Sequence, residues 1–185
     1  TYTVPQLIQD VLINSPCAQV SNFQTQGNCG IGYFSYGGSP SNFAFQDGVI
    51  IRAGNANFSS GNYTGNNQGT PCSNAGDAEL QAVSSANVQT GTINDVSFIK
   101  FDFKPFTDNF SFNFVFASNE YGEYQCGYSD VFAFILTDLT TGVSQNLAVI
   151  PNTSTPVSVT TIRDQAFNSP GDTCLSANPT FFDVY

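Results

Sequence analysis

Three acidic side chains, Glu120, Glu123 and Asp130, lie close together in a chain that has few charges. Asn119 precedes them, and several main-chain carbonyl groups lie between them. Calcium binds several carboxylate, amide and carbonyl oxygens in a flexible array, which a loop of this composition can supply. These four side chains therefore predict a calcium site, with calcium as the expected cofactor. Two alternatives stay open: the acids cap turns and accept backbone hydrogen bonds, or they contact a ligand directly.

Paired carboxylates also serve as the catalytic groups of glycosidases, which hold them about 5 to 10 Å apart. Glu120 and Glu123 could meet that distance, but nothing else in the chain resembles a glycosidase. The chain has no tryptophan, a common sugar-stacking residue, and no histidine, which excludes nucleophilic triads built on histidine. The sequence therefore favours a protein that is not an enzyme.

Five cysteines indicate disulfide bonds and an oxidising compartment, because no Cys-x-x-Cys pair or histidine is present to bind zinc. We expect Cys17 to pair with Cys29, which closes a short local loop. We expect Cys126 to pair with Cys174, which would tie the acidic residues to a late segment of the chain. Cys72 would then have no partner in this chain. Other pairings stay open, because spacing alone does not determine connectivity.

The charge balance excludes several classes of partner. Only 10% of the residues are charged, and four basic residues against 14 acidic ones give a net charge of −10. Nucleic acid and anionic membrane surfaces require clustered cations, so neither is an expected partner. No run approaches the roughly 20 apolar residues of a membrane span, so we expect no direct membrane insertion. A surface built from neutral polar residues is typical of secreted proteins.

Two predicted strands flank the acidic residues and would position them. Phenylalanine alternates with small or polar residues over 110–117, which predicts a half-buried strand. The segment 131–137 is almost wholly apolar, which predicts an interior strand covered on both faces. A loop between two such strands would bring the acidic side chains close together.

Further strands and two helices complete the prediction. Alternating residues predict a strand over 98–104, the Asp47-Gly48 pair predicts a hairpin turn, and later strands are expected at 145–150 and 157–162. Apolar residues at helical spacing predict a helix over 3–14, capped by Thr3 with Gln6, and a short helix is expected at 77–83.

These elements favour an all-β fold, a β-sandwich of the jelly-roll type with a short N-terminal helix. We expect residues 1–185 to form a single domain. The last residues, 181–185, have the composition of a strand, so we also expect a longer polypeptide from which this domain is truncated.

The segment Phe112–Tyr121, which reads FNFVFASNEY, is followed by Glu123 and by SDVFAF from Ser129. Together they resemble the signature of the choice-of-anchor L domain family. Residues 3–17, 47–54 and 76–80 are similar to other parts of that family in the same order. The resemblance implies a secreted domain of large surface proteins, typically from Bacteroidota. It also implies export by type IX secretion, a link of some carriers to gliding motility, and no enzymatic activity.

The leading interpretation is a non-catalytic, extracellular adhesion or surface-display module, located at the cell surface after removal of a signal peptide. Its expected partners are other domains of the same large protein, glycans, or a secretion or anchoring complex. One alternative is a calcium-dependent carbohydrate-binding domain. Another is a structural subunit of a surface filament or outer-membrane complex.

Overall fold

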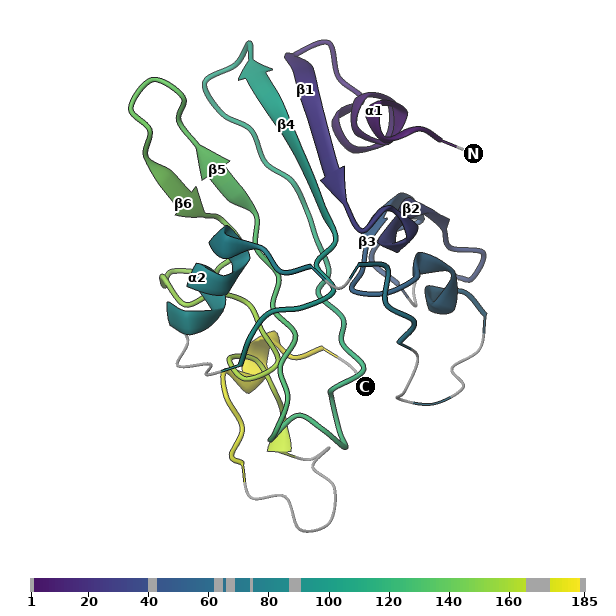
Figure 1. Cartoon of the computed structure of the whole chain (residues 1–185), viewed down its shortest axis with the longest axis vertical. Helices are drawn as coiled ribbons and strands as arrows, with labels where there is room; N and C mark the ends of the chain where they lie inside the picture. Colours follow the sequence, from purple (N-terminus) through teal and green to yellow (C-terminus); the bar gives the residue numbers. More distant parts are fainter. Residues whose placement is uncertain are drawn as a thin grey trace. The chain divides into compact units, whose positions relative to one another are not determined.

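A computed structural model describes the chain as short strands, turns and loops with helices near the N-terminus and at 78–86 (Figure 1). Its contacts divide the chain into two compact units. The first unit comprises Thr1–Gly76 and Asn94–Val115, and the second comprises Asp77–Ile93 and Phe116–Tyr185. The described residues are 2–39, 43–61, 65, 69–73, 75–86, 91–165 and 174–183.

The first unit begins with the predicted N-terminal helix, which is α-helical over Val4–Gln6 (α1) and π-helical over Leu7–Ile13. Its start is capped as expected, because the Gln6 side chain accepts hydrogen bonds from the main-chain N–H and the hydroxyl of Thr3. The first two residues of the π-helical part are fully buried. The helix ends at Asn14, whose left-handed conformation breaks the turn.

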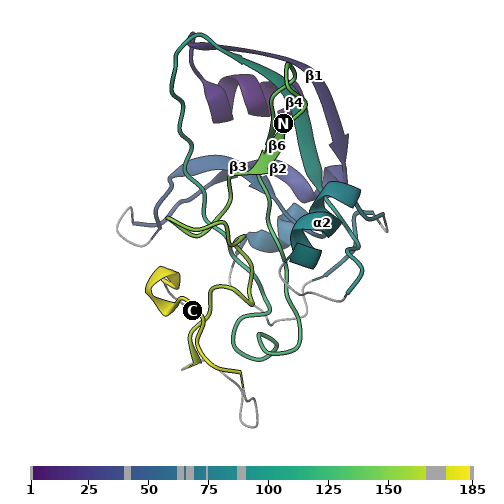
Figure 2. The ribbon, with the colours of Figure 1, turned by 90° about the vertical axis from the view of Figure 1, so that its left-hand side faces the viewer.

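Two antiparallel strands, β1 (Ala18–Gln26) and β4 (Phe98–Pro105), form the longest ladder of this unit (Figure 2). β4 confirms the strand predicted over 98–104, whereas β1 was not predicted. A bulge between Ser21 and Gln24 interrupts β1, with Asn22 at a positive φ of 55°. Because a bulge breaks the alternation of side chains, this strand lacks the pattern by which strands are recognised.

The second ladder of the first unit pairs β2 (Ile31–Ser35) with β3 (Asp47–Ile51) in antiparallel register. The predicted Asp47-Gly48 hairpin turn is therefore wrong, since both residues lie within β3. Gly48 does not have a positive φ. Its hydrogen faces the ring of Phe34, which lies 2.9 Å from where a Cβ would be. The glycine is needed for this close approach rather than for a turn.

A disulfide joins Cys29 to Cys72, and the thiol of Cys17 is free and exposed. The predicted Cys17–Cys29 pair is therefore wrong. Strand β1 separates these two cysteines by roughly 30 Å of extended chain, whereas a disulfide needs Cα atoms within about 7 Å. Asp95 positions the true partner, because its carboxylate accepts hydrogen bonds from the N–H groups of Cys72 and Ser73, both at 2.8 Å.

The second unit contains helix α2 (Ala78–Ala86) and the hairpin of β5 (Ile135–Thr137) with β6 (Ser144–Asn146). α2 confirms the short helix predicted at 77–83 and extends it. Asp77 caps the helix, since its carboxylate accepts a hydrogen bond from the N–H of Leu80 at 2.8 Å.

The interior strand predicted over 131–137 is wrong in extent and position. Only β5 forms a ladder there, and among the described residues its partner is β6 alone. The predicted strand over 110–117 forms no assigned strand, and 157–162 contributes one isolated bridge, from Ser158 to Val131. Alternating phenylalanines over 110–117 indicate that the segment has an apolar and a polar face. A strand also requires a neighbouring segment with which to pair, and the alternation does not indicate one.

The described sheets have two strands each, so no jelly roll is assembled from them. The fold is mainly short strands and loops, as the all-β prediction requires, with the N-terminal helix in place. The hydrophobic core of the second unit lies in a compact segment over 147–159. Its buried residues are Ala148, Ile150, Val157, Ser158 and Val159.

Candidate functional site

The acidic residues lie in a segment of the second unit, residues 118–130, which we call the acidic loop. The loop is more ordered than an open connection. The N–H of Tyr124 donates to the carbonyl of Glu120 at 3.1 Å, and the N–H of Tyr128 donates to the carbonyl of Tyr124 at 3.0 Å. Gly122, at φ 83°, prevents these turns from continuing as a regular helix.

The inner side of the acidic loop is held by two polar side chains four residues apart. The Tyr121 hydroxyl donates to the carbonyl of Ile162 at 2.8 Å. The Gln125 amide donates to the carbonyl of Asp164 at 3.0 Å and accepts the N–H of Gly122 at 3.2 Å. Gln125 is 0% exposed and Gly122 is buried, so the Gln125 amide supplies hydrogen bonds that water cannot replace at its own atoms and at the N–H of Gly122.

A disulfide between Cys126 and Cys174 fixes the same side of the loop, and it is the pair that the sequence indicated. The segment that carries Cys174 is itself attached, because Ala177 and Arg163 exchange two main-chain hydrogen bonds. Burial raises the pKa of Tyr121 to about 12, with a smaller contribution from Asp130. Its phenol therefore stays protonated and keeps donating its hydrogen bond.

The predicted metal ligands interact with different neighbours in the acidic loop. Asp130 accepts a hydrogen bond from the Ser118 hydroxyl at 2.6 Å, and that hydroxyl accepts the N–H of Glu120 at 3.1 Å. Burial, and next the charge of Asp130, raise the pKa of Glu120. Glu123 interacts with the phenol of Tyr124 and raises its pKa, and the charge of Glu120 contributes to the same rise. Asn119 is half-buried.

No group of three or more histidine, cysteine, aspartate or glutamate side chains is arranged to hold a metal ion among the described residues. The calcium site therefore stays a prediction. Ser118 connects two of its acids, because its hydroxyl donates to the carboxylate of Asp130 and accepts the N–H of Glu120, and the charge of Asp130 raises the pKa of Glu120.

The repulsion between these two acids predicts a pH-dependent stability. The pKa of Glu120 is raised above its ordinary value of 4.5, so its contribution to stability is present below that value and is lost as the pH rises through the raised pKa. We therefore expect Glu120→Gln to raise the melting temperature at pH 7, and the difference to disappear at pH 3.5–4. Thermal unfolding followed by circular dichroism at the two pH values measures the melting temperatures of the variant and the native chain.

Asp138 offers a matched control of opposite sign in the same unit. Hydrogen bonds from the N–H groups of Thr140 and Thr141 lower its pKa, so its contribution is present at neutral pH and is lost on acidification. Asp138→Asn should lower the melting temperature at pH 7. A fall in melting temperature for Glu120→Gln at pH 7 would contradict the assigned environment of Glu120.

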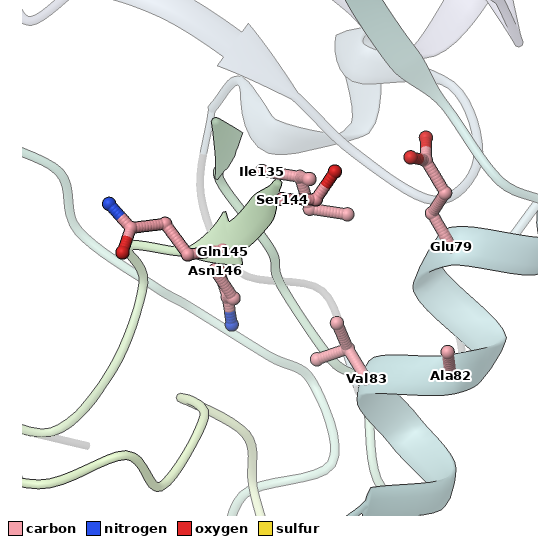
Figure 3. A pocket seen from close by; sticks show the side chains of 7 residues that line it. All are labelled: Glu79, Ala82, Val83, Ile135, Ser144, Gln145 and Asn146. Atoms are coloured by element: carbon pink, nitrogen blue, oxygen red, sulfur yellow. The ribbon is translucent and has the colours of Figure 1, made fainter. Parts of the chain in front are cut away.

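A groove of about 230 Å³ lies between α2 and the β5–β6 hairpin (Figure 3). Val83 points from the helix toward the hairpin, whereas the side chain of Gln145 extends away from the helix. This volume is below the range of about 300 to 1,000 Å³ that is typical of small-molecule sites. The lining residues are Glu79, Ala82, Val83, Ile135, Ser144, Gln145 and Asn146.

A family comparison identifies the chain. The sequence model of the choice-of-anchor L domain matches residues 1–185, the whole chain. The chain belongs to the choice-of-anchor L domain family. Membership in this family makes it a module of a surface, extracellular protein, and its two disulfides fit that location. Neither the curated proteins nor the solved structures contain a match.

The choice-of-anchor L domain has no described helix with the length and apolar character required to span a membrane.

Sequence reasoning located the acidic loop but missed Gln125, Tyr124 and Tyr128. The available signal was the spacing of four residues between Tyr121 and Gln125 and between the other two tyrosines, which is the spacing of helical neighbours.

Proposed function

We propose that this choice-of-anchor L domain is a non-catalytic adhesion module of a large surface protein. It contacts its partner through the outer side of the acidic loop. The observation that carries this proposal is the contrast between the two sides of that loop. Gln125 and Cys126 are fixed on the inner side, whereas Tyr128 is 65% exposed on the outer side. A preformed surface loses little conformational entropy when it binds.

The acidic residues of the loop support binding, because Glu123 interacts with the phenol of the exposed Tyr124 and the charge of Glu120 also raises the pKa of that phenol. The same loop would also serve contacts with other domains of the parent protein or with an anchoring complex.

A bead assay tests the proposal, and the free thiol of Cys17 allows the domain to be coupled in one orientation. Beads carrying the native chain are passed over immobilised basic protein, acidic polysaccharide and neutral polysaccharide. We expect native beads to be retained on at least one coating more strongly than beads blocked with cysteine. A Cys126→Ser, Cys174→Ser variant, coupled through the same thiol, should lose that retention. Equal retention of native and blocked beads on every coating would overturn the proposal.

The second candidate is calcium-dependent binding, including binding to carbohydrate, which is favoured by the close approach of Glu120 and Asp130. A divalent cation would relieve the repulsion that raises the pKa of Glu120. Calcium should then stabilise the fold by about 2.7 kcal/mol at a hundredfold excess over its dissociation constant. Thermal melts with calcium and with chelator measure this effect.

Two variants separate a metal site from a general effect of salt. Glu120→Gln and Asp130→Asn should each abolish the response to calcium, while magnesium at the same concentration controls for ionic strength. An unchanged melting temperature of the native domain in calcium would end the calcium hypothesis and leave the adhesion proposal intact.

A further inference from the structure

We infer that Tyr124 and Tyr128 form a binding site for a lysine or arginine side chain of a partner protein. This inference rests on the proposed adhesion function and names the chemistry of the partner. The two rings lie 5.9 Å apart between centroids and meet at 88°. Tyr124 is 36% exposed and Tyr128 is 65% exposed, so the pair lies at the surface rather than in the core.

The two rings are presented by a backbone that does not need to reorganise. The hydrogen bond from the N–H of Tyr128 to the carbonyl of Tyr124 closes the turn that brings the rings together. Gln125 and Cys126 lie between the two tyrosines in sequence, and both are anchored on the inner side of the acidic loop. The corner between the rings is therefore built before any partner arrives.

The local electrostatics favour a cation. The face of an aromatic ring attracts an ammonium or guanidinium group that lies within about 6 Å of its centre. Glu123 interacts directly with the phenol of Tyr124, and the charges of Glu120 and Glu123 both raise the pKa of that phenol. The Tyr124 phenol thus remains protonated beside two carboxylates, and a cation would interact with the rings and the carboxylates together.

The charge of the whole second unit agrees with this local arrangement. By sequence it contains nine of the 14 acidic residues and one of the four basic residues, Arg163, which gives a formal charge of −8 out of −10. This arginine already has a hydrogen-bond partner within the unit, because its Nε donates to the carbonyl of Leu175 at 2.8 Å. A basic partner is attracted by this charge, whereas an acidic partner is repelled.

A neutral sugar fits the same site less well. A neutral sugar has no net charge, so it lacks the Coulombic attraction that the surrounding acids exert on a cation. The observations therefore favour a cationic side chain, and glycan binding becomes an outcome of the test.

The test titrates the intact chain with a capped tetralysine peptide, using isothermal calorimetry at low and high salt. The matched probe is the same peptide with acetylated lysines, which is neutral. We expect tetralysine to bind, the acetylated peptide not to bind, and binding to weaken at high salt. Replacing Tyr124 and Tyr128 together with leucine should weaken binding by about tenfold.

Two further variants distinguish the loss of the two rings from misfolding of the leucine variant. Tyr124→Phe with Tyr128→Phe keeps both rings and should retain binding, while Tyr33→Leu removes a 40%-exposed aromatic ring of the first unit and should change nothing. Equal binding of the leucine and phenylalanine variants would overturn the inference, as would equal binding of the acetylated peptide or competition by a neutral oligosaccharide. Bead retention without tetralysine binding would reject the inference but not the adhesion function.

Discussion

Replacing Cys126 and Cys174 together with serine is expected to lower the free energy of unfolding by about 4 kcal/mol. The disulfide closes a loop of 48 residues, and the chain-entropy model assigns about this cost to releasing a loop of that length. The loss is a large fraction of the total stability of a domain, which is about 5 to 15 kcal/mol. Urea unfolding followed by circular dichroism measures the change.

The other cysteines provide matched controls for this experiment. The Cys29–Cys72 pair closes a loop of 43 residues, so its removal should cost a similar amount. Cys17→Ser should leave the stability within about 0.5 kcal/mol of the native value, since its thiol is exposed and unpaired. Peptide mapping without reductant should show alkylated Cys17, and a peptide that links Cys17 to Cys29 would contradict the structure.

The second large effect is expected at Gln125, where Gln125→Leu should lower the free energy of unfolding by about 1 to 3 kcal/mol. Leucine has a similar volume but leaves the N–H of Gly122 and the carbonyl of Asp164 without their hydrogen bonds. A buried polar group without a partner costs about 1 to 3 kcal/mol. Urea unfolding gives the difference between the variant and the native chain.

The control for this substitution is another glutamine of the second unit. Gln145 lies on β6 with its side chain exposed, so Gln145→Leu should change the stability by no more than about 0.5 kcal/mol. If both variants lost the same amount, the special role of Gln125 would be contradicted. Gln125→Glu should also destabilise the fold, because a carboxylate cannot donate a hydrogen bond to the Asp164 carbonyl.

Local signals allowed several elements to be predicted from the sequence. The N-terminal helix has its capping residues and an apolar stripe within a few positions. α2 is preceded by its capping aspartate. In β4, apolar and charged residues alternate from Ile99 to Lys104. Each of these depends on neighbours in the sequence, so a single sequence contains the information.

Features that depend on distant partners were not predictable in this way. The Asp47-Gly48 pair has the composition of a turn, but its glycine is required by the ring of Phe34 on the adjacent strand. The short loop favoured a bond between Cys17 and Cys29, and only the unpredicted strand β1 shows that they are far apart. The role of Gly48 and the distance between the two cysteines both depend on which segments form strands and how these pair. The spacing of residues along the sequence does not reveal that pairing.

The acidic loop combines both situations. Its position and its acids followed from the sequence, but the neighbours with which Glu120 and Glu123 interact depend on how the loop turns. That turn is held by Gln125, which accepts the N–H of Gly122 within the loop and donates to the carbonyl of Asp164, 39 residues away in the chain. A glutamine between two tyrosines does not indicate from its sequence context that it will be fully buried.

Amide hydrogen exchange of the intact chain tests the central claim, that the acidic loop is a rigid surface fixed from its inner side. The N–H groups of Tyr124 and Tyr128 donate hydrogen bonds within the loop, as those of Ile150 and Val157 do in the core. We predict that the two tyrosine amides exchange nearly as slowly as the two core amides. In the Cys126→Ser, Cys174→Ser variant they should exchange fast. Fast exchange of both tyrosine amides in the native chain would contradict the account.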